Sequence, residues 1–185
     1  MKPLVKTLSL TSLIIIGSQA NAHGENGSVG AGAGASYGLL GASFEAKFIP
    51  NLYTSFGLGS IAGDHVGYNV GLRYYLLDQE RIWRPRLVAN YGTNGLIKTR
   101  RCKTFLSSTV CDYRDYEGFE GTSIGFGQTL AFGESRHNGL EIDLLYKVDD
   151  GGMSDRVDEI KDQGNVVEDE HDSRLFFSIG YRFFF

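Results

Sequence analysis

The sequence contains little proline, few cysteines and no long apolar segment after its first residues. Only 3 of its 185 residues are proline and 2 are cysteine, whereas 25 are glycine. No stretch after residue 22 approaches the roughly 18 consecutive apolar residues that a membrane-spanning helix needs, which excludes an α-helical membrane protein. The formal net charge of −4 argues against general nucleic-acid binding through a basic surface.

The first 22 residues have the features of a secretory signal peptide. Lys2 and Lys6 precede an apolar stretch over residues 8–17, and Ala20-Asn21-Ala22 follows it. A charged start, an apolar segment of about ten residues and an A-x-A site are the three parts of such a signal. We expect cleavage after Ala22, which leaves one exported domain over residues 23–185 and changes the net charge from −4 to −6.

The last 13 residues alternate between two kinds of side chain. The even positions of this stretch are largely polar, and the odd positions are Leu175, Phe177, Ile179, Tyr181, Phe183 and Phe185. A period of two residues predicts a β-strand with one face against an apolar medium.

The same alternation recurs in seven earlier segments. The expected strands cover residues 29–37, 40–49, 52–59, 66–76, 85–94, 119–132 and 140–148. In each, one face is apolar and the other is mostly Gly, Ser, Asn and Thr with a few charges, although Gln128 falls on an apolar face. A membrane protein without spanning helices must close its strands into a barrel, because lipid satisfies no backbone hydrogen bonds.

The connections between these strands differ in length on the two sides of the predicted barrel. If the C-terminus is periplasmic, the periplasmic turns lie near residues 50–51, 78–84 and 133–138, and all are short. The other side has a tight turn at Gly38, a second at residues 60–65, and two long segments near 95–118 and 150–172. Short periplasmic turns and longer outer loops are typical of outer-membrane barrels.

An exported chain that ends in an amphipathic strand closing on Phe185 resembles the small outer-membrane β-barrel proteins of Gram-negative bacteria, such as the OmpA membrane domain and OmpX. The resemblance implies an all-β fold, namely an eight-stranded antiparallel up-and-down transmembrane barrel. It also implies recognition of the C-terminal strand by the barrel-assembly machinery, and contact with membrane lipid and lipopolysaccharide. A closed barrel has no edge that demands a partner, so we expect a monomer.

A soluble, lipocalin-like barrel is the competing fold. Its apolar faces would point inward and its polar faces would meet water. The polar faces of this chain carry few Lys and Glu residues, which favours a cramped interior over a solvated surface.

Eight charged residues occupy the polar faces of the expected strands. They are Glu45, Lys47, Arg73, Arg86, Glu141, Asp143, Lys147 and Arg182. The interior of an eight-stranded barrel is just wide enough for side chains to fill, and an unpaired buried charge is costly. We therefore expect a salt-bridged network that fills the lumen, with a narrow selective pore as the alternative.

Two outer segments carry opposite charges. A basic cluster consists of Lys98, Arg100, Arg101 and Lys103, whereas residues 149–172 hold ten acidic and two basic residues, a local charge of −8. The basic cluster is a candidate site for lipopolysaccharide phosphates. The two segments leave strands roughly 10 Å apart, so we expect a salt-sensitive contact between them. The acidic residues do not follow EF-hand spacing, so no metal site is predicted.

The two cysteines, Cys102 and Cys111, lie nine positions apart in the third outer segment, with no histidine near them. Two cysteines in an exported chain most simply form one disulfide in an oxidising compartment. We predict this bridge rather than a metal site.

His171 and Ser173 suggest an enzymatic alternative. The lipid A deacylases are similar barrels that use a His and a Ser on the lipid side. Ser attack on an ester needs His as a base and a carboxylate to orient it, and Glu168 and Glu170 are nearby. The deacylase pattern has an aromatic residue between His and Ser within a strand, whereas Asp172 intervenes here at a loop edge. We therefore predict no catalytic residues, no cofactor, and a structural or surface-interaction role.

Overall fold

The computed structural model describes residues 26–61, 65–78, 80–105, 108–149, 151–162, 166–170 and 173–185, without the side chains of residues 99–115 and 166–170. The expected signal peptide lies outside these residues. The barrel strands are β1 (Gly27–Gly34), β2 (Leu39–Ile49), β3 (Leu52–Ser60), β4 (Val66–Tyr75), β5 (Trp83–Phe105), β6 (Ser108–Phe132), β7 (Asn138–Lys147) and β9 (Leu175–Phe184).

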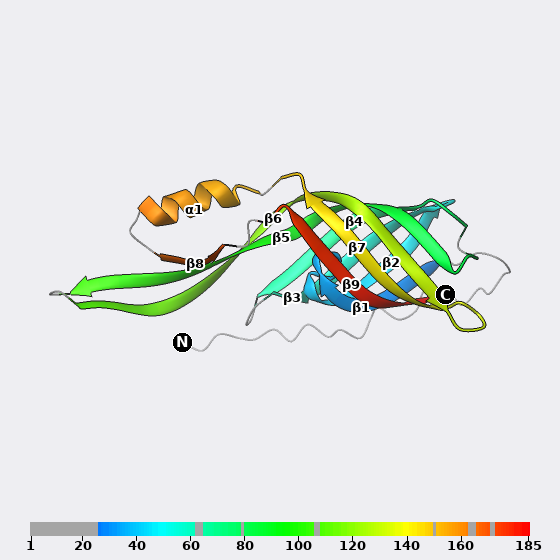
Figure 1. The fold of residues 1–185 in the computed structure, drawn as a ribbon, viewed down its shortest axis with the longest axis horizontal. Coiled ribbons are helices and arrows are strands. Elements are labelled where there is room, and N and C mark those ends of the chain that lie inside the picture. Colours follow the sequence, from blue (N-terminus) through cyan, green and yellow to red (C-terminus); the bar gives the residue numbers. More distant parts are fainter. Residues whose placement is uncertain are drawn as a thin grey trace, which may run out of the picture.

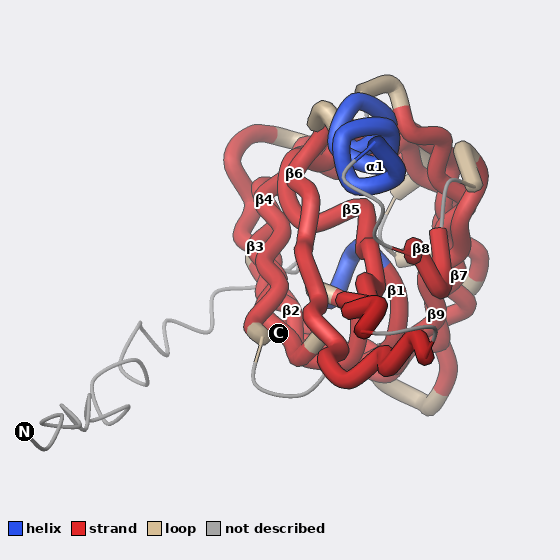
Figure 2. Tube along the Cα trace, turned by 90° about the vertical axis from the view of Figure 1, so that its left-hand side faces the viewer, coloured by secondary structure: helices blue, strands red, loops and turns tan. Residues whose placement is uncertain are grey.

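These eight strands form one closed antiparallel barrel. Their order is β4-β3-β2-β1-β9-β7-β6-β5, and an additional pairing of β4 with β5 closes the ring. Figure 2 looks onto one end and shows the strands as a ring. Apart from the β1–β9 contact, neighbouring barrel strands follow one another along the chain, which confirms the predicted up-and-down topology. Among the described helices, none has the length and apolar character needed to cross a membrane.

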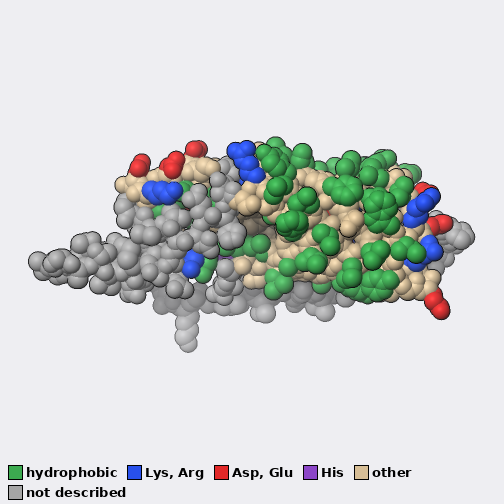
Figure 3. Space-filling model, in the orientation of Figure 1, with side chains coloured by type: hydrophobic (Ala, Val, Ile, Leu, Met, Phe, Trp, Pro, Cys, Tyr) green, Lys and Arg blue, Asp and Glu red, His purple; other side chains and the backbone are tan. Residues whose placement is uncertain are grey.

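The outer wall of the barrel is apolar and the inner wall is polar. Leu72, Leu130 and Phe177 point outward and are 47%, 52% and 67% exposed, and Figure 3 shows hydrophobic side chains gathered over the barrel. The small polar residues of the opposite faces, such as Ser43 and Asn90, are buried. An outward apolar band is the arrangement of a transmembrane barrel and the reverse of a lipocalin.

Aromatic and amide groups meet on the outer wall toward the end that carries Phe185. The indole of Trp83 donates a hydrogen bond to Gln128 Oε1 over 3.1 Å, and Tyr181 donates one to Asn138 Oδ1. Such polar tips on apolar rings suit the interface between hydrocarbon and water. The partner of Gln128 thus explains why an amide interrupts an otherwise apolar face.

The connection from β1 to β2 differs from the prediction. The strand was expected to reach Tyr37 with this residue facing outward, but β1 ends at Gly34 and Ala35–Tyr37 form a 3-10 turn, η1, inside the lumen. Tyr37 is completely buried. The flanking Gly34 and Gly38 have φ values of 113° and 65°, which L side chains rarely adopt.

Glycines of the surrounding strands make room for η1. A Cβ atom at Gly180 would lie 2.1 Å from the Tyr37 hydroxyl, and one at Gly59 would lie 2.4 Å from the Tyr37 carbonyl oxygen. These faces lack side chains because an inserted turn occupies the space that side chains fill elsewhere in a small barrel.

The two long outer segments are also more ordered than predicted. Residues 95–118 were expected to form a loop, but β5 continues to Phe105 and β6 begins at Ser108, and the paired strands project from the barrel as a hairpin (Figure 1). The acidic segment contains helix α1 (Met153–Asp162) and strand β8 (Val166–Glu170). We call residues 95–105, 108–118, 153–162 and 166–170 the outer lobe.

The basic and acidic segments meet within this lobe, as expected, but through backbone pairing and apolar packing. Strand β8 pairs with β5, with Asp169 opposite Lys98. Met153, Val157 and Ile160 share one face of α1 and pack against Ile97 and Phe119. A small apolar core therefore adds to any attraction between the opposite charges.

We predict that Phe177→Arg lowers the free energy of unfolding by about 2–4 kcal/mol, because it places a cation in the hydrocarbon band. Urea titration of the protein in lipid bilayers measures the change. Phe177→Leu is the control and should have a much smaller effect. Equal effects of the two substitutions would contradict the assignment of this face to lipid.

Candidate functional site: the ionic network of the lumen

An ionic network crosses the lumen. Its three guanidinium groups come from β4, β5 and β9, and its three carboxylates come from β2 and β7. The members are Arg73, Arg86, Arg182, Glu45, Glu141 and Asp143, and each is at most 1% exposed. Because formal charges balance within this set, the network can be buried without a counter-ion.

Glu141 is the centre of the network. Its Oε2 lies 2.7 Å from Arg182 Nε, 3.0 Å from Arg86 Nη2 and 3.2 Å from Arg73 Nη1. Its Oε1 accepts a hydrogen bond from Arg182 Nη2 over 2.9 Å and another from the hydroxyl of Tyr37. One carboxylate therefore joins three barrel strands and the inserted turn to β7.

The other two carboxylates complete the pairing. Glu45 Oε1 lies 2.5 Å from Arg73 Nη1 and 3.1 Å from Arg182 Nη1, and its Oε2 accepts a hydrogen bond from Tyr75. Asp143 Oδ1 lies 2.6 Å from Arg86 Nη2, and its Oδ2 accepts a hydrogen bond of 2.8 Å from Ser36 of η1. Charge-assisted bonds of this kind are stronger than neutral ones.

The two predicted lumen lysines lie outside this network. Lys147 is buried, and its Nζ contacts Met153 Sδ at 4.0 Å. Lys47 was expected to point into the closed lumen, but it is exposed. It stands near the end of β2, beside a register shift between Lys47 and Ile49.

The sequence-based prediction missed some of the residues that lie in the lumen. Arg84 is two residues from Arg86 and shares its face of β5, but the strand was expected to begin after Arg84. Its guanidinium lies 4.6 Å from the centre of the Phe184 ring and donates to the carbonyl of Arg81 over 2.9 Å. Tyr37 was missed because only the tertiary fold turns η1 inward.

The described residues contain no arrangement for catalysis by His and Ser. His171 lies outside the described residues, and Ser173 Oγ donates a hydrogen bond of 2.6 Å to the carbonyl of Leu175. No group of three metal-ligating side chains occurs within the described part of the chain. The three carboxylates of the ionic network instead form ion pairs with arginines.

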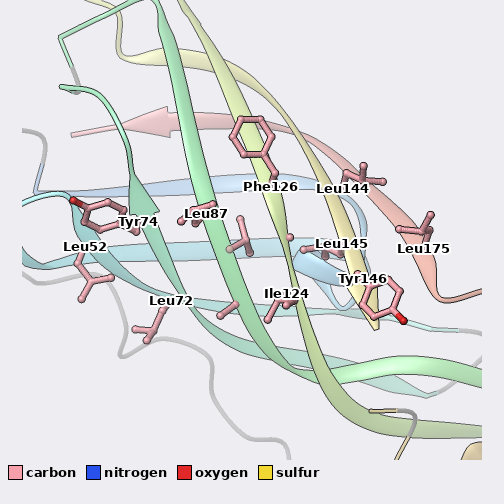
Figure 4. Close-up of a pocket in the computed structure, with 13 residues that line it drawn as sticks. Leu52, Leu72, Tyr74, Leu87, Ile124, Phe126, Leu144, Leu145, Tyr146 and Leu175 are labelled. Atoms are coloured by element: carbon pink, nitrogen blue, oxygen red, sulfur yellow. The ribbon is translucent and has the colours of Figure 1, made fainter. Parts of the chain in front are cut away.

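A pocket of about 680 Å³ lies along strands β3 to β7 and β9 (Figure 4). Its lining is apolar and aromatic, and includes the outward-facing Leu72, Ile124, Phe126 and Tyr146. No charged side chain lines it. These properties suit contact with lipid acyl chains rather than polar chemistry.

The extended hairpin places the cysteines opposite each other. Cys102 and Cys111 are register partners of β5 and β6. Directly opposed residues of antiparallel strands have Cα atoms about 4.5–5.5 Å apart, which is within the range that a disulfide spans. Their side chains lie outside the described part of the structure, so the disulfide stays a prediction.

We predict that Glu141→Gln destabilises the barrel by about 3–5 kcal/mol, because it leaves a buried positive charge without compensation. Urea unfolding in lipid bilayers measures the loss, and the exposed Glu134→Gln serves as a control of the same chemistry. A loss as small as that of the control would show that the network contributes little to stability.

We also predict that Cys102 and Cys111 are disulfide-bonded and that the bridge stabilises the outer lobe by roughly 2–3 kcal/mol. Alkylation of the purified protein without reductant should label neither cysteine. Reduction should leave the barrel folded, because none of its strand pairings depends on the bridge. Labelling of both thiols before reduction would refute the pairing.

Comparison with known proteins finds a match in structure alone. No protein-family model and no curated protein matches the chain. Among solved structures, it is similar to the N-terminal β-barrel domain of Pseudomonas aeruginosa OprF, with a TM-score of 0.51 and 15% sequence identity over 88% of this chain and all of that domain. The chain thus has the closed eight-stranded fold found in small outer-membrane barrels.

Proposed function

We propose that this protein is a non-enzymatic outer-membrane barrel that holds a rigid lobe at the cell surface for contact with other molecules. The observation that carries this proposal is the contrast between the two ends of β5 and β6. One end belongs to a barrel whose lumen is filled by η1 and the ionic network, and the other builds the outer lobe.

The filled lumen supports an anchoring role over a conducting one. The network joins β2, β4, β5, β7 and β9 at a level where its members are at most 1% exposed. An ion that crossed this layer would have to separate buried charge pairs, which is costly in a medium of low dielectric constant.

The outer lobe offers two features for recognition. Within the described residues, β6 pairs with β7 only from Ser123 onward, so residues 108–121 have one strand edge without a barrel neighbour. Unpaired backbone groups at such an edge can accept an added strand. The second feature is the basic cluster on β5.

The basic cluster suits the phosphates of lipopolysaccharide. Arginine can bind phosphate through two parallel hydrogen bonds, and lysine adds a compact charge. The proposal therefore includes residence in the outer membrane as a monomer after removal of the signal peptide, with assembly guided by the C-terminal strand. Its support is the apolar outer band and the similarity in fold to the OprF barrel domain.

We predict that replacing Arg100, Arg101 and Lys103 by glutamine weakens binding of lipopolysaccharide by at least about tenfold, since exposed charge pairs contribute up to about 1 kcal/mol each. Lys98 is left intact because it lies opposite the acidic Asp169 of β8, whereas Arg100 lies opposite Val166. Titration of the detergent-solubilised protein with fluorescent lipopolysaccharide measures the affinity.

The control replaces Lys47, Arg81 and Arg136, three exposed cations of the opposite end, and should bind as the unaltered protein does. Dephosphorylated lipopolysaccharide should bind the unaltered protein as weakly as the cluster variant binds the native lipid. An equal loss in both variants would mean that net charge alone governs binding, and an unchanged affinity in the cluster variant would refute the site.

A further inference from the structure

The apolar pocket of Figure 4 crosses the strands of the barrel wall as an inclined groove. Two rows of register partners on the outward faces of the strands line it. The first row, from β9 to β4, is Leu175, Tyr146, Ile124, Ala89 and Leu72. The second row, from β7 to β3, is Leu144, Phe126, Leu87, Tyr74 and Leu52.

The groove descends from the outer end of the barrel into the membrane. Leu175 is the first residue of β9, directly after the outer segment, whereas Leu72 lies near the inner end of β4. The first row spans four strand spacings, roughly 19 Å. Because the strands of such barrels tilt by about 35–45°, the row descends roughly 11–13 Å. This depth lies within the hydrocarbon of one leaflet, which is about 15 Å thick.

Ala89 leaves a gap in the first row. Its register partners on the neighbouring strands are Leu72 and Ile124, and the next outward residues of its own strand are Leu87 and Tyr91. All four side chains are larger than a methyl group. The depression above Ala89 therefore exposes apolar surface on several sides, which a flexible hydrocarbon chain can contact closely.

A cation lies at the outer end of the groove. Arg174 is exposed, and its carbonyl oxygen accepts a hydrogen bond of 2.8 Å from the backbone N–H of Lys147, which ties it to β7. Its Nη1 donates a hydrogen bond of 3.3 Å to the hydroxyl of Tyr146, a lining residue of the groove. An arginine in this position can bind a phosphate through two parallel hydrogen bonds.

The outer rim above the middle of the groove has the opposite charge. Glu120 of β6 is exposed, and its Oε2 accepts a hydrogen bond of 3.3 Å from the hydroxyl of Tyr91. A phosphate is repelled by this carboxylate and attracted by Arg174. The two charges thus favour a phosphate at the β9 end of the groove, with a hydrocarbon chain running from there toward β4.

We propose that this groove binds one molecule of lipid A, with a phosphate at Arg174 and one acyl chain over Ala89. An acyl chain matches a lining without charged side chains. Lipid A fits better than a phospholipid because Arg174 lies at the outer end of the barrel, and the outer leaflet consists of lipopolysaccharide. The inference rests on the proposed residence in the outer membrane, but not on the basic cluster of the outer lobe.

The test is native mass spectrometry of the full-length refolded protein in detergent micelles that contain equimolar lipid A and phosphatidylglycerol. The unaltered protein should retain one lipid A in preference to phosphatidylglycerol. Ala89→Trp fills the gap, and Arg174→Gln removes the charge-assisted hydrogen bonds to phosphate, so each should lower retention by about tenfold or more. Arg174→Lys, which keeps the charge, should retain more lipid A than Arg174→Gln.

The matched controls lie outside the groove. Ala31→Trp makes the same change on the exposed face of β1, and Arg81→Gln removes an exposed arginine at the inner end, so both should retain lipid A. Equal retention by Ala89→Trp and Ala31→Trp would overturn the proposal. Equal retention of lipid A and phosphatidylglycerol by the unaltered protein would overturn it as well.

Two further measurements separate this site from the proposed function. The variant with Arg100, Arg101 and Lys103 replaced by glutamine should retain lipid A in the groove, and a loss there equal to that of Ala89→Trp would overturn a distinct site. Because the assay uses purified lipids, its result does not depend on where the cell places the protein. Fractionation of the cell envelope tests that residence separately.

Discussion

The carboxylate of Glu141 is the contact on which the interior of this barrel depends. It accepts hydrogen bonds from three arginines and from Tyr37, and these donors come from three other strands and the inserted turn. Because these groups are buried away from bulk solvent, each bond is stronger than in water, and each missing partner is correspondingly costly. The register of the strands and the position of η1 are therefore coupled through one side chain.

The barrel wall separates lipid from the lumen, and two of its strands continue beyond the barrel into the outer lobe. Lipid-facing side chains are apolar, lumen-facing ones are polar or glycine, and β5 and β6 then leave the barrel to form the outer lobe. No loop intervenes between the barrel and the hairpin, so β5 and β6 connect the lobe directly to the barrel wall, with a register shift between Thr93 and Gly95 at the junction. Within the lumen, the layer of Ala35, Val88, Leu145 and Phe176 divides a balanced ionic network from the single ammonium of Lys147.

The sequence-based predictions failed where the environment of a side chain cannot be inferred from the two-residue period of the sequence. Tyr37 continues the apolar alternation of β1, yet it lies inside the lumen. Glycines on neighbouring strands leave space for its ring, and its hydroxyl donates a hydrogen bond to Glu141. Residues 95–118 are rich in charge and lack a clear two-residue period, because as an outer-lobe hairpin they do not face lipid on one side. The helix α1 was hidden for a similar reason, since its three apolar residues stand among acidic ones.

The sequence by itself determined the eight barrel strands, the facing of most of their side chains and most of the charged residues that line the lumen, because a membrane imposes a strict alternation that survives in the amino-acid order. It also determined that the basic and acidic segments would be close. Only the tertiary structure decided which charges pair, that η1 fills the lumen, and that the buried Lys147 has no carboxylate partner among the described residues. These outcomes depend on distances between strands far apart in the chain, and periodicity carries no information about such distances.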